Sequence, residues 1–77
     1  MKNREDIANQ VISIVVDTLR CKQAVTERTS FVDDLDADSL DLVELIMEVE
    51  KTFDVEVEDD VLKTIRTVGD VVDYLAK

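Results

Sequence analysis

The residues best placed to do chemistry lie in mid-chain, where Ser39 follows Asp36 and Asp38 and precedes Asp41. Asp38 and Asp41 have the spacing of a helix N-cap with a capping box, in which aspartate replaces the commoner glutamate. If Asp38 caps the helix, Ser39 is the first helical residue, and its hydroxyl is not needed for capping and points outward. A phosphate ester there would be stabilised by the free N–H groups and by the positive end of the helix dipole.

Ser39 is not expected to act as a catalytic nucleophile. A nucleophilic serine needs a base, usually histidine, and the chain contains no histidine. The neighbouring aspartates also make the local potential negative, which disfavours an alkoxide. We therefore expect a protein that is not an enzyme, with Ser39 as a substrate for another enzyme. On spacing alone, a plain first-turn serine remains the alternative.

The acids before Ser39 suggest calcium as a second kind of chemistry. Asp34, Asp36 and Asp38 match the first, third and fifth positions of an EF-hand loop. The loop also demands a glycine and a final glutamate, and Ser39 and Leu45 occupy those positions. We therefore predict no metal site, although loose surface binding of divalent cations stays open.

The elements that must position Ser39 are predicted to be helices. The 77 residues contain no proline and one glycine, and a small domain without metal or disulfide staples usually relies on well-packed helices. We expect one all-α domain over residues 1–77, a small four-helix bundle with a long first loop and a short third helix. Apolar periodicity and capping signals predict helices over about 3–19, 38–53, 59–65 and from Thr67 onward.

Two further features support these boundaries. Thr67 and Asp70 repeat the capping-box spacing at the last helix. The connection over residues 20–37 is long for a compact domain, and Val25, Phe31 and Leu35 are predicted to pin it to the core.

The second helix carries two separate apolar stripes when its residues are turned by about 100° each. The first is wide enough for a core-facing stripe: Leu42, Leu45, Ile46, Val49 and Phe53. The second is bordered by Asp41, Glu44 and Glu48: Leu40, Val43 and Met47. Because a surface helix needs only one apolar stripe, the second predicts a docking surface with an apolar centre and an acidic rim. The alternatives are that this stripe is also core, under the first loop, and that the acids form a solvated face.

Charge and cysteine content indicate which partners and which cellular compartment to expect. Residues 33–60 hold thirteen acids and one base, Lys51, within a chain of net charge −10. Such acidity argues against nucleic acid and against anionic membrane surfaces as partners. The single cysteine, Cys21, forms no internal disulfide and is expected to be an inert thiol in a reducing compartment. No apolar run reaches the roughly 20 residues of a membrane span, and a cytoplasmic location is expected.

Several stretches together resemble the acyl carrier protein family. They are Phe31-Val32-Asp33-Asp34-Leu35, Ala37-Asp38-Ser39-Leu40-Asp41, Val43-Glu44-Leu45, Phe53-Asp54, Thr67-Val68 and Asp73-Tyr74-Leu75. The resemblance implies that a phosphopantetheinyl transferase attaches 4′-phosphopantetheine from coenzyme A to Ser39 through a phosphodiester, which makes the chain a phosphoprotein. The terminal thiol of that arm would hold acyl chains as thioesters.

The resemblance also assigns surfaces. It implies docking to basic patches on fatty acid synthesis enzymes and acyltransferases through Asp38, Leu40, Asp41, Val43, Glu44, Met47 and Glu48. It implies that the acyl chain is lined by Ile46, Val49, Val57, Leu62 and Ile65. A monomer without stable membrane insertion is expected.

The chain departs from the family at a few positions. Asp36 stands where the family usually has glycine, so the turn before the helix is expected to differ. Lys51 and Lys63 replace frequent acids, and the proline often found just after the position of Val57 is missing. Peptidyl carriers usually show Gly-Gly where this chain has Asp36-Ala37, which favours an acyl cargo over an aminoacyl one.

Four functions are compatible with these observations. The leading hypothesis is an acyl carrier for dissociated fatty acid biosynthesis. The second is a carrier of a specialised polyketide, modified-lipid or aminoacyl pathway, kept open by Asp36. The third is an acidic interaction module in which Ser39 is unmodified, and the last is a calcium-binding domain.

Overall fold

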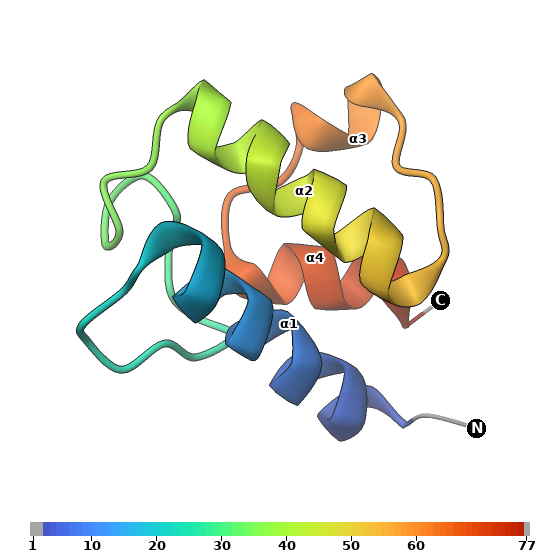
Figure 1. Ribbon diagram of the computed structural model, residues 1–77, viewed down its shortest axis with the longest axis horizontal. Helices are drawn as coiled ribbons and strands as arrows, with labels where there is room; N and C mark the ends of the chain where they lie inside the picture. The colour runs from blue at the N-terminus through green and yellow to red at the C-terminus, as the bar shows by residue number, and fades with distance from the viewer. Residues whose placement is uncertain (1–2, 77) are drawn as a thin grey trace.

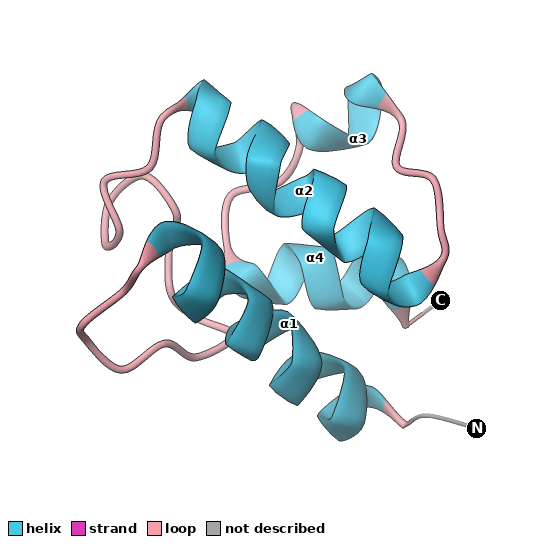
Figure 2. Cartoon of the chain, in the orientation of Figure 1, coloured by secondary structure: helices cyan, strands magenta, loops and turns pink. Residues whose placement is uncertain are grey.

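The computed structural model describes residues 3–76 and contains four helices in that part of the chain (Figure 1). They are α1 (Arg4–Leu19), α2 (Ser39–Phe53), α3 (Asp59–Leu62) and α4 (Val68–Leu75). Figure 2 shows helices and loops without a strand in the described residues, and the only β pairing there is an isolated bridge between Ser30 and Thr67. The predicted all-α bundle, with its long first loop and short third helix, is confirmed.

Helix α1 packs against both α2 and α4. Asn3 caps its start by accepting a hydrogen bond from the Asp6 N–H at 2.9 Å. The helix buries Val11 and Val15 completely, so both lie on its core-facing side. Arg20 ends the helix in a left-handed conformation, φ 53°, and its N–H donates to the carbonyl of Val16. None of the described helices is long and apolar enough to cross a membrane.

A single hydrophobic core joins the four helices and the first loop. Its largest completely buried side chains are Val11, Val15, Phe31, Leu45, Val49, Val68 and Val72. Burying an aliphatic or aromatic side chain of this size contributes about 1.5–3 kcal/mol. Phe31 anchors the loop as predicted, while Val25 and Leu35 are half-buried against the same core.

The first loop is tied to the start of α4 by backbone hydrogen bonds. The N–H of Val68 donates to the carbonyl of Thr29 at 3.0 Å, and that of Gly69 donates to the carbonyl of Glu27 at 2.8 Å. A Cβ at position 69 would lie 2.9 Å from that Glu27 oxygen, so the close approach requires glycine. The N–H of Phe31 donates to the carbonyl of Arg66 at 3.0 Å. The loop therefore has a defined path despite its length.

Helix α3 is shorter than predicted: it ends at Leu62, whereas the prediction placed its end at Ile65. Glu58 at its N-cap makes no side-chain capping bond. After the helix, the Thr64 hydroxyl donates to the Val61 carbonyl at 2.7 Å, which favours a turn over continued helix. The turn brings Ile65 into the core, where it is 7% exposed.

Candidate functional site

Ser39 is the first residue of α2 and is exposed to solvent. The Asp38 carboxylate accepts from the Asp41 N–H at 2.9 Å, and the Asp41 carboxylate accepts from the Asp38 N–H at 3.2 Å. This reciprocal pair is the predicted capping box. The Ser39 hydroxyl makes no hydrogen bond to any described residue, so capping leaves it available. The N–H groups of Ser39 and Leu40 also have no intrahelical acceptor, since they belong to the first turn.

The turn before α2 depends on Asp36, which adopts φ 53°. This left-handed conformation favours glycine, although aspartate tolerates it better than most residues. The next residue, Ala37, is buried, and its N–H donates to the Phe31 carbonyl at 2.8 Å. The turn therefore holds Asp36 in a left-handed conformation, which glycine adopts without strain.

The chain's other serines have different surroundings. Ser13 is exposed in the middle of α1, away from any helix N-terminus. Ser30 is half-buried, and its hydroxyl oxygen accepts from the Asp33 N–H at 3.1 Å. Ser39 is thus the serine that combines exposure, freedom from hydrogen bonds and a helix N-terminus.

The second apolar stripe of α2 faces solvent. Leu40 is 70% exposed, Val43 43% and Met47 50%, so the interpretation of these residues as core is wrong. Val32, in the loop before α2, is also exposed. Sequence reasoning did not single out Val32 as a surface residue because its loop has no periodicity that distinguishes inward from outward positions.

The acids beside this stripe divide into two groups. Asp38 and Asp41 are engaged in the capping box, whereas Glu44 and Glu48 project into solvent. Glu48 approaches Lys51 at 3.7 Å, with both side chains at least half exposed. Exposed ion pairs of this kind contribute little to the free energy of folding. The face therefore keeps a strongly negative character.

The residues predicted to line an acyl chain lie in and against the hydrophobic core. Ile46, Val49 and Ile65 are buried, and Val57 and Leu62 pack half-buried against them. A surface cavity of about 370 Å³ opens beside Ile65. Its other lining residues are Val61, Thr64, Asp70, Asp73 and Tyr74.

The segment between α2 and α3 is held from both sides. The Glu50 carboxylate accepts from the Val57 N–H at 2.9 Å, and the Tyr74 hydroxyl donates to the Glu56 carbonyl at 3.2 Å. Helix α3 itself buries no residue completely. This side of the core is therefore covered by a short helix with few tight contacts.

Three groups outside the site have shifted pKa values. The pKa of Arg4 is raised, first by its hydrogen bond to Asp73 and then by that to Glu27. The pKa of Asp70 is lowered, first because its carboxylate accepts from the Arg66 N–H at 2.9 Å and then through its bonds to Thr67. Burial raises the pKa of the Cys21 thiol, which reduces its reactivity. Within residues 3–76, no group of three or more acidic, histidine or cysteine side chains is arranged to hold a metal ion.

Known proteins match this chain over almost its whole length. Residues 9–75 match the family described as "Phosphopantetheine attachment site". A Mycobacterium tuberculosis protein assigned as an acyl carrier protein superposes with a TM-score of 0.85 at 34% identity, covering 91% of this chain and 95% of its own. The acyl carrier protein of Enterococcus faecalis gives 0.77 at 33% identity, covering 97% and 96%.

The chain therefore belongs to the phosphopantetheine-dependent carrier family. Within that family, its likeness in sequence and structure is to acyl carrier proteins, which are carriers and not enzymes. The observed site fits such a prosthetic group, because an exposed and unbonded hydroxyl lies at the positive end of a helix.

Proposed function

We propose that Ser39 is the attachment residue and that the loaded chain carries acyl groups in fatty acid biosynthesis. The observation that carries this proposal is the geometry of Ser39, whose hydroxyl is exposed beside a capping box that does not use it. When bound, phosphopantetheine supplies the thiol that holds an acyl group as a thioester.

In the attachment step, the Ser39 hydroxyl oxygen forms a bond to the pantetheine-side phosphorus of coenzyme A. The bond from that phosphorus to adenosine 3′,5′-bisphosphate breaks, and the hydroxyl proton passes to a base on the transferase. The base must come from the transferase, because this chain has no histidine and the acids nearest Ser39 are engaged in capping. The helix N-terminus favours the phosphodiester that results.

The exposed face of α2 is the proposed docking surface for the transferase and for acyl-processing enzymes with basic patches. Its residues are Asp38, Leu40, Asp41, Val43, Glu44, Met47 and Glu48. Exposed apolar side chains at the centre supply contact area, and the rim charges steer the encounter with basic partners. The high exposure of Leu40 and Met47 supports this role.

The acyl chain is proposed to enter the core beneath α3. Ile46, Val49, Val57, Leu62 and Ile65 would line it. This region supports the proposal because α3 has no side-chain cap and buries no residue completely, so little must be broken to move it. We further propose that the chain is a monomer and acts in the cytoplasm.

Intact-mass measurement after co-expression with a broad-specificity phosphopantetheinyl transferase tests the attachment. The wild-type chain should gain the mass of one phosphopantetheine group, and Ser39→Ala should gain none. Ser13→Ala is the matched control, since it removes another exposed helical serine and should load fully. Absence of added mass on the wild-type chain would refute the carrier proposal.

The pathway needs a separate test. Cells depleted of their own fatty-acid acyl carrier should grow when this chain is expressed and loaded. Full loading without growth would instead favour a carrier of a specialised pathway. The charged Asp36 is the residue that leaves this second hypothesis open.

A further inference from the structure

Helix α3 lies in a segment, residues 58–65, that we call the α3 segment. The N–H groups of residues 61–65 donate to carbonyls of residues 58–62, and the Thr64 hydroxyl donates to the Val61 carbonyl. Among the described residues, the backbone hydrogen bonds of the α3 segment therefore all lie within it. Apart from the packing of its side chains on the core, the segment is held by the residues at its two ends.

The end that leads into α4 is anchored through the backbone. The Phe31 N–H donates to the Arg66 carbonyl at 3.0 Å, and the Arg66 N–H donates to the Asp70 carboxylate at 2.9 Å. The isolated β-bridge between Ser30 and Thr67 adjoins these bonds. Moving this end would require the first loop to separate from α4, so it is the fixed end of the segment.

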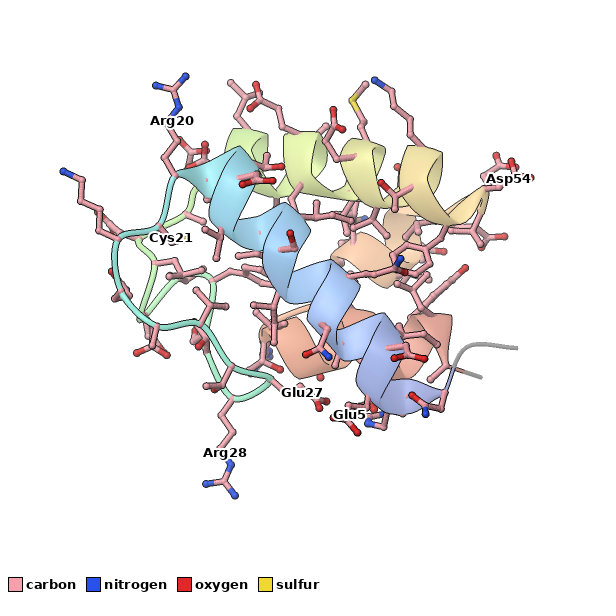
Figure 3. All side chains as sticks on the ribbon, turned by 60° about the horizontal axis from the view of Figure 1, so that its bottom comes forward. Glu5, Arg20, Cys21, Glu27, Arg28 and Asp54 are labelled. Carbon is pink, nitrogen blue, oxygen red and sulfur yellow. The ribbon has the colours of Figure 1, made fainter. Side chains whose placement is uncertain are left out.

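The end that follows α2 is held by Glu50. Its backbone carbonyl accepts from the N–H groups of Asp54 and Val55, the latter at 3.1 Å, and Figure 3 shows Asp54 where the α2 ribbon ends. Its side-chain carboxylate accepts from the Val57 N–H at 2.9 Å. One half-buried residue thus binds the N–H groups of three of the four residues that lead into the α3 segment.

The bonds at this second end can break more easily than those at the fixed end. The Val57 bond depends on the Glu50 side chain, and the only other printed tie there is the Tyr74 hydroxyl, which donates to the Glu56 carbonyl at 3.2 Å. Each of these bonds can break by rotation of one side chain. Residues 54–60 also contain five acids and no base, so charge repulsion around Glu50 opposes the closed position.

We propose that Glu50 is a latch residue, meaning that its carboxylate must release Val57 before the α3 segment can swing open about Arg66. Val57 and Leu62 pack half-buried against the core, and such a swing would carry both away from it. The inference deepens the proposed function and rests on it for one point, namely that an acyl chain lies beneath α3. In the loaded chain, Glu50 is then a positioning residue that keeps the cargo away from water.

Native-state hydrogen exchange tests the latch on the chain without its prosthetic group. The Leu62 amide, which donates within the α3 segment, reports on opening of the segment, and the Val68 amide reports on the fixed end. Glu50→Ala removes the latch bond, whereas Glu50→Gln keeps an acceptor oxygen in the same place. The matched control is Val11→Ala, because it weakens the core from α1 without touching the latch bond.

Glu50→Ala should speed exchange at Leu62 about tenfold, the size expected for loss of a hydrogen bond to a charged acceptor. Glu50→Gln should restore most of the protection. Val11→Ala should speed exchange at Val68 and leave Leu62 nearly unchanged, because opening of the segment does not require the core to unfold. Unchanged exchange at Leu62 in Glu50→Ala, or equal acceleration of Leu62 and Val68 in Val11→Ala, would overturn the proposal.

A second measurement asks whether the latch shields a cargo. The parent chain and Glu50→Ala are loaded with an octanoyl thioester, and its cleavage by hydroxylamine is timed. Cleavage should be faster in Glu50→Ala by a factor similar to that of exchange at Leu62. Faster exchange with unchanged cleavage would support the latch and contradict the acyl path beneath α3. Failure of the exchange result would overturn the latch wherever the cargo lies, so the two failures are distinguishable.

Discussion

Helices α2 and α4 begin with the same kind of capping box, but the first residues of the two helices have different roles. Each starts with a complete capping box, Asp38 with Asp41 in α2 and Thr67 with Asp70 in α4. The residue that follows the cap is exposed Ser39 in one helix and completely buried Val68 in the other. A cap therefore defines where a helix begins, and the packing around it decides whether its first residue is an anchor or a site.

The surroundings of the two helix starts explain the difference. The start of α4 is covered by the first loop through the backbone bonds to Thr29 and Glu27. The start of α2 follows the left-handed turn at Asp36, and only the preceding Ala37 is buried. The first loop thus stabilises one helix start and leaves the other open to partners.

The largest expected difference between the two helix starts is the effect of their first residues on stability. Val68→Ala should lower the free energy of unfolding by about 2 kcal/mol, because it removes buried methyl groups and leaves a cavity. Ser39→Ala should change it by less than about 0.5 kcal/mol, as for an exposed position. Urea denaturation followed by circular dichroism measures both. Equal losses would show that Ser39 is structural.

The two caps should be alike in stability and unlike in function. Asp38→Ala and Thr67→Ala each remove an N-cap side chain and should each cost about 1 kcal/mol, the usual value for a lost helix cap. Asp38→Ala should also raise the KM for attachment of phosphopantetheine, since it loosens the turn that presents Ser39. Thr67→Ala should leave that KM unchanged. A similar rise in both variants would assign the effect to general destabilisation.

Acid should weaken the α4 cap through Asp70. Its folded-state pKa lies below the ordinary value of 3.8, chiefly because of the Arg66 N–H. This stabilisation is present above the unfolded-state pKa and is lost as pH falls through the lower, folded-state pKa. Urea midpoints between pH 7 and pH 3 should therefore fall less steeply for Asp70→Asn than for the parent chain. Parallel slopes would remove Asp70 from the acid response.

In the turn before α2, replacing Asp36 by glycine and by alanine should change the stability of the fold in opposite directions. Asp36→Gly should stabilise the fold by about 0.5 kcal/mol, because glycine adopts positive φ without strain. Asp36→Ala makes the same charge change and should be the less stable variant by about 1 kcal/mol, since alanine is strained there. Denaturation midpoints give the order. An alanine variant at least as stable as the glycine variant would contradict the observed left-handed turn.

The smallest expected change in stability concerns the exposed face of α2. Met47→Glu should leave the free energy of unfolding within about 0.5 kcal/mol and raise the KM of the transferase for the chain. Leu45→Ala, on the buried face, should instead cost about 3 kcal/mol. Loss of fold in the Met47 variant would move that residue into the core and away from docking.

Local signals in the sequence predicted most of the architecture. Capping-box spacing located the starts of α2 and α4, and periodicity identified the buried face of α2 around Leu45 and Val49. The end of α3 was missed because a threonine hydroxyl can bond the carbonyl three residues earlier within a helix as well as in a turn, so Thr64 alone is no stop signal. The conformation of Asp36 was also missed, since aspartate, unlike glycine, does not signal positive φ.

Contacts between distant segments were beyond reach of the sequence. Arg4 pairs with Glu27 at 2.7 Å and with Asp73 at 2.6 Å, joining α1, the first loop and α4. The bond from the Tyr74 hydroxyl to the Glu56 carbonyl likewise depends on how α4 packs beside the segment before α3. No periodicity or spacing specifies such pairings, because each depends on the assembled core.

Fragmentation mass spectrometry of the loaded chain tests the central claim most directly, because it identifies the residue that carries the added group. We predict that every fragment containing the added mass includes Ser39, with Ser13 and Ser30 unmodified. Added mass on a fragment that excludes Ser39, or an undiminished mass gain in Ser39→Ala, would contradict the account.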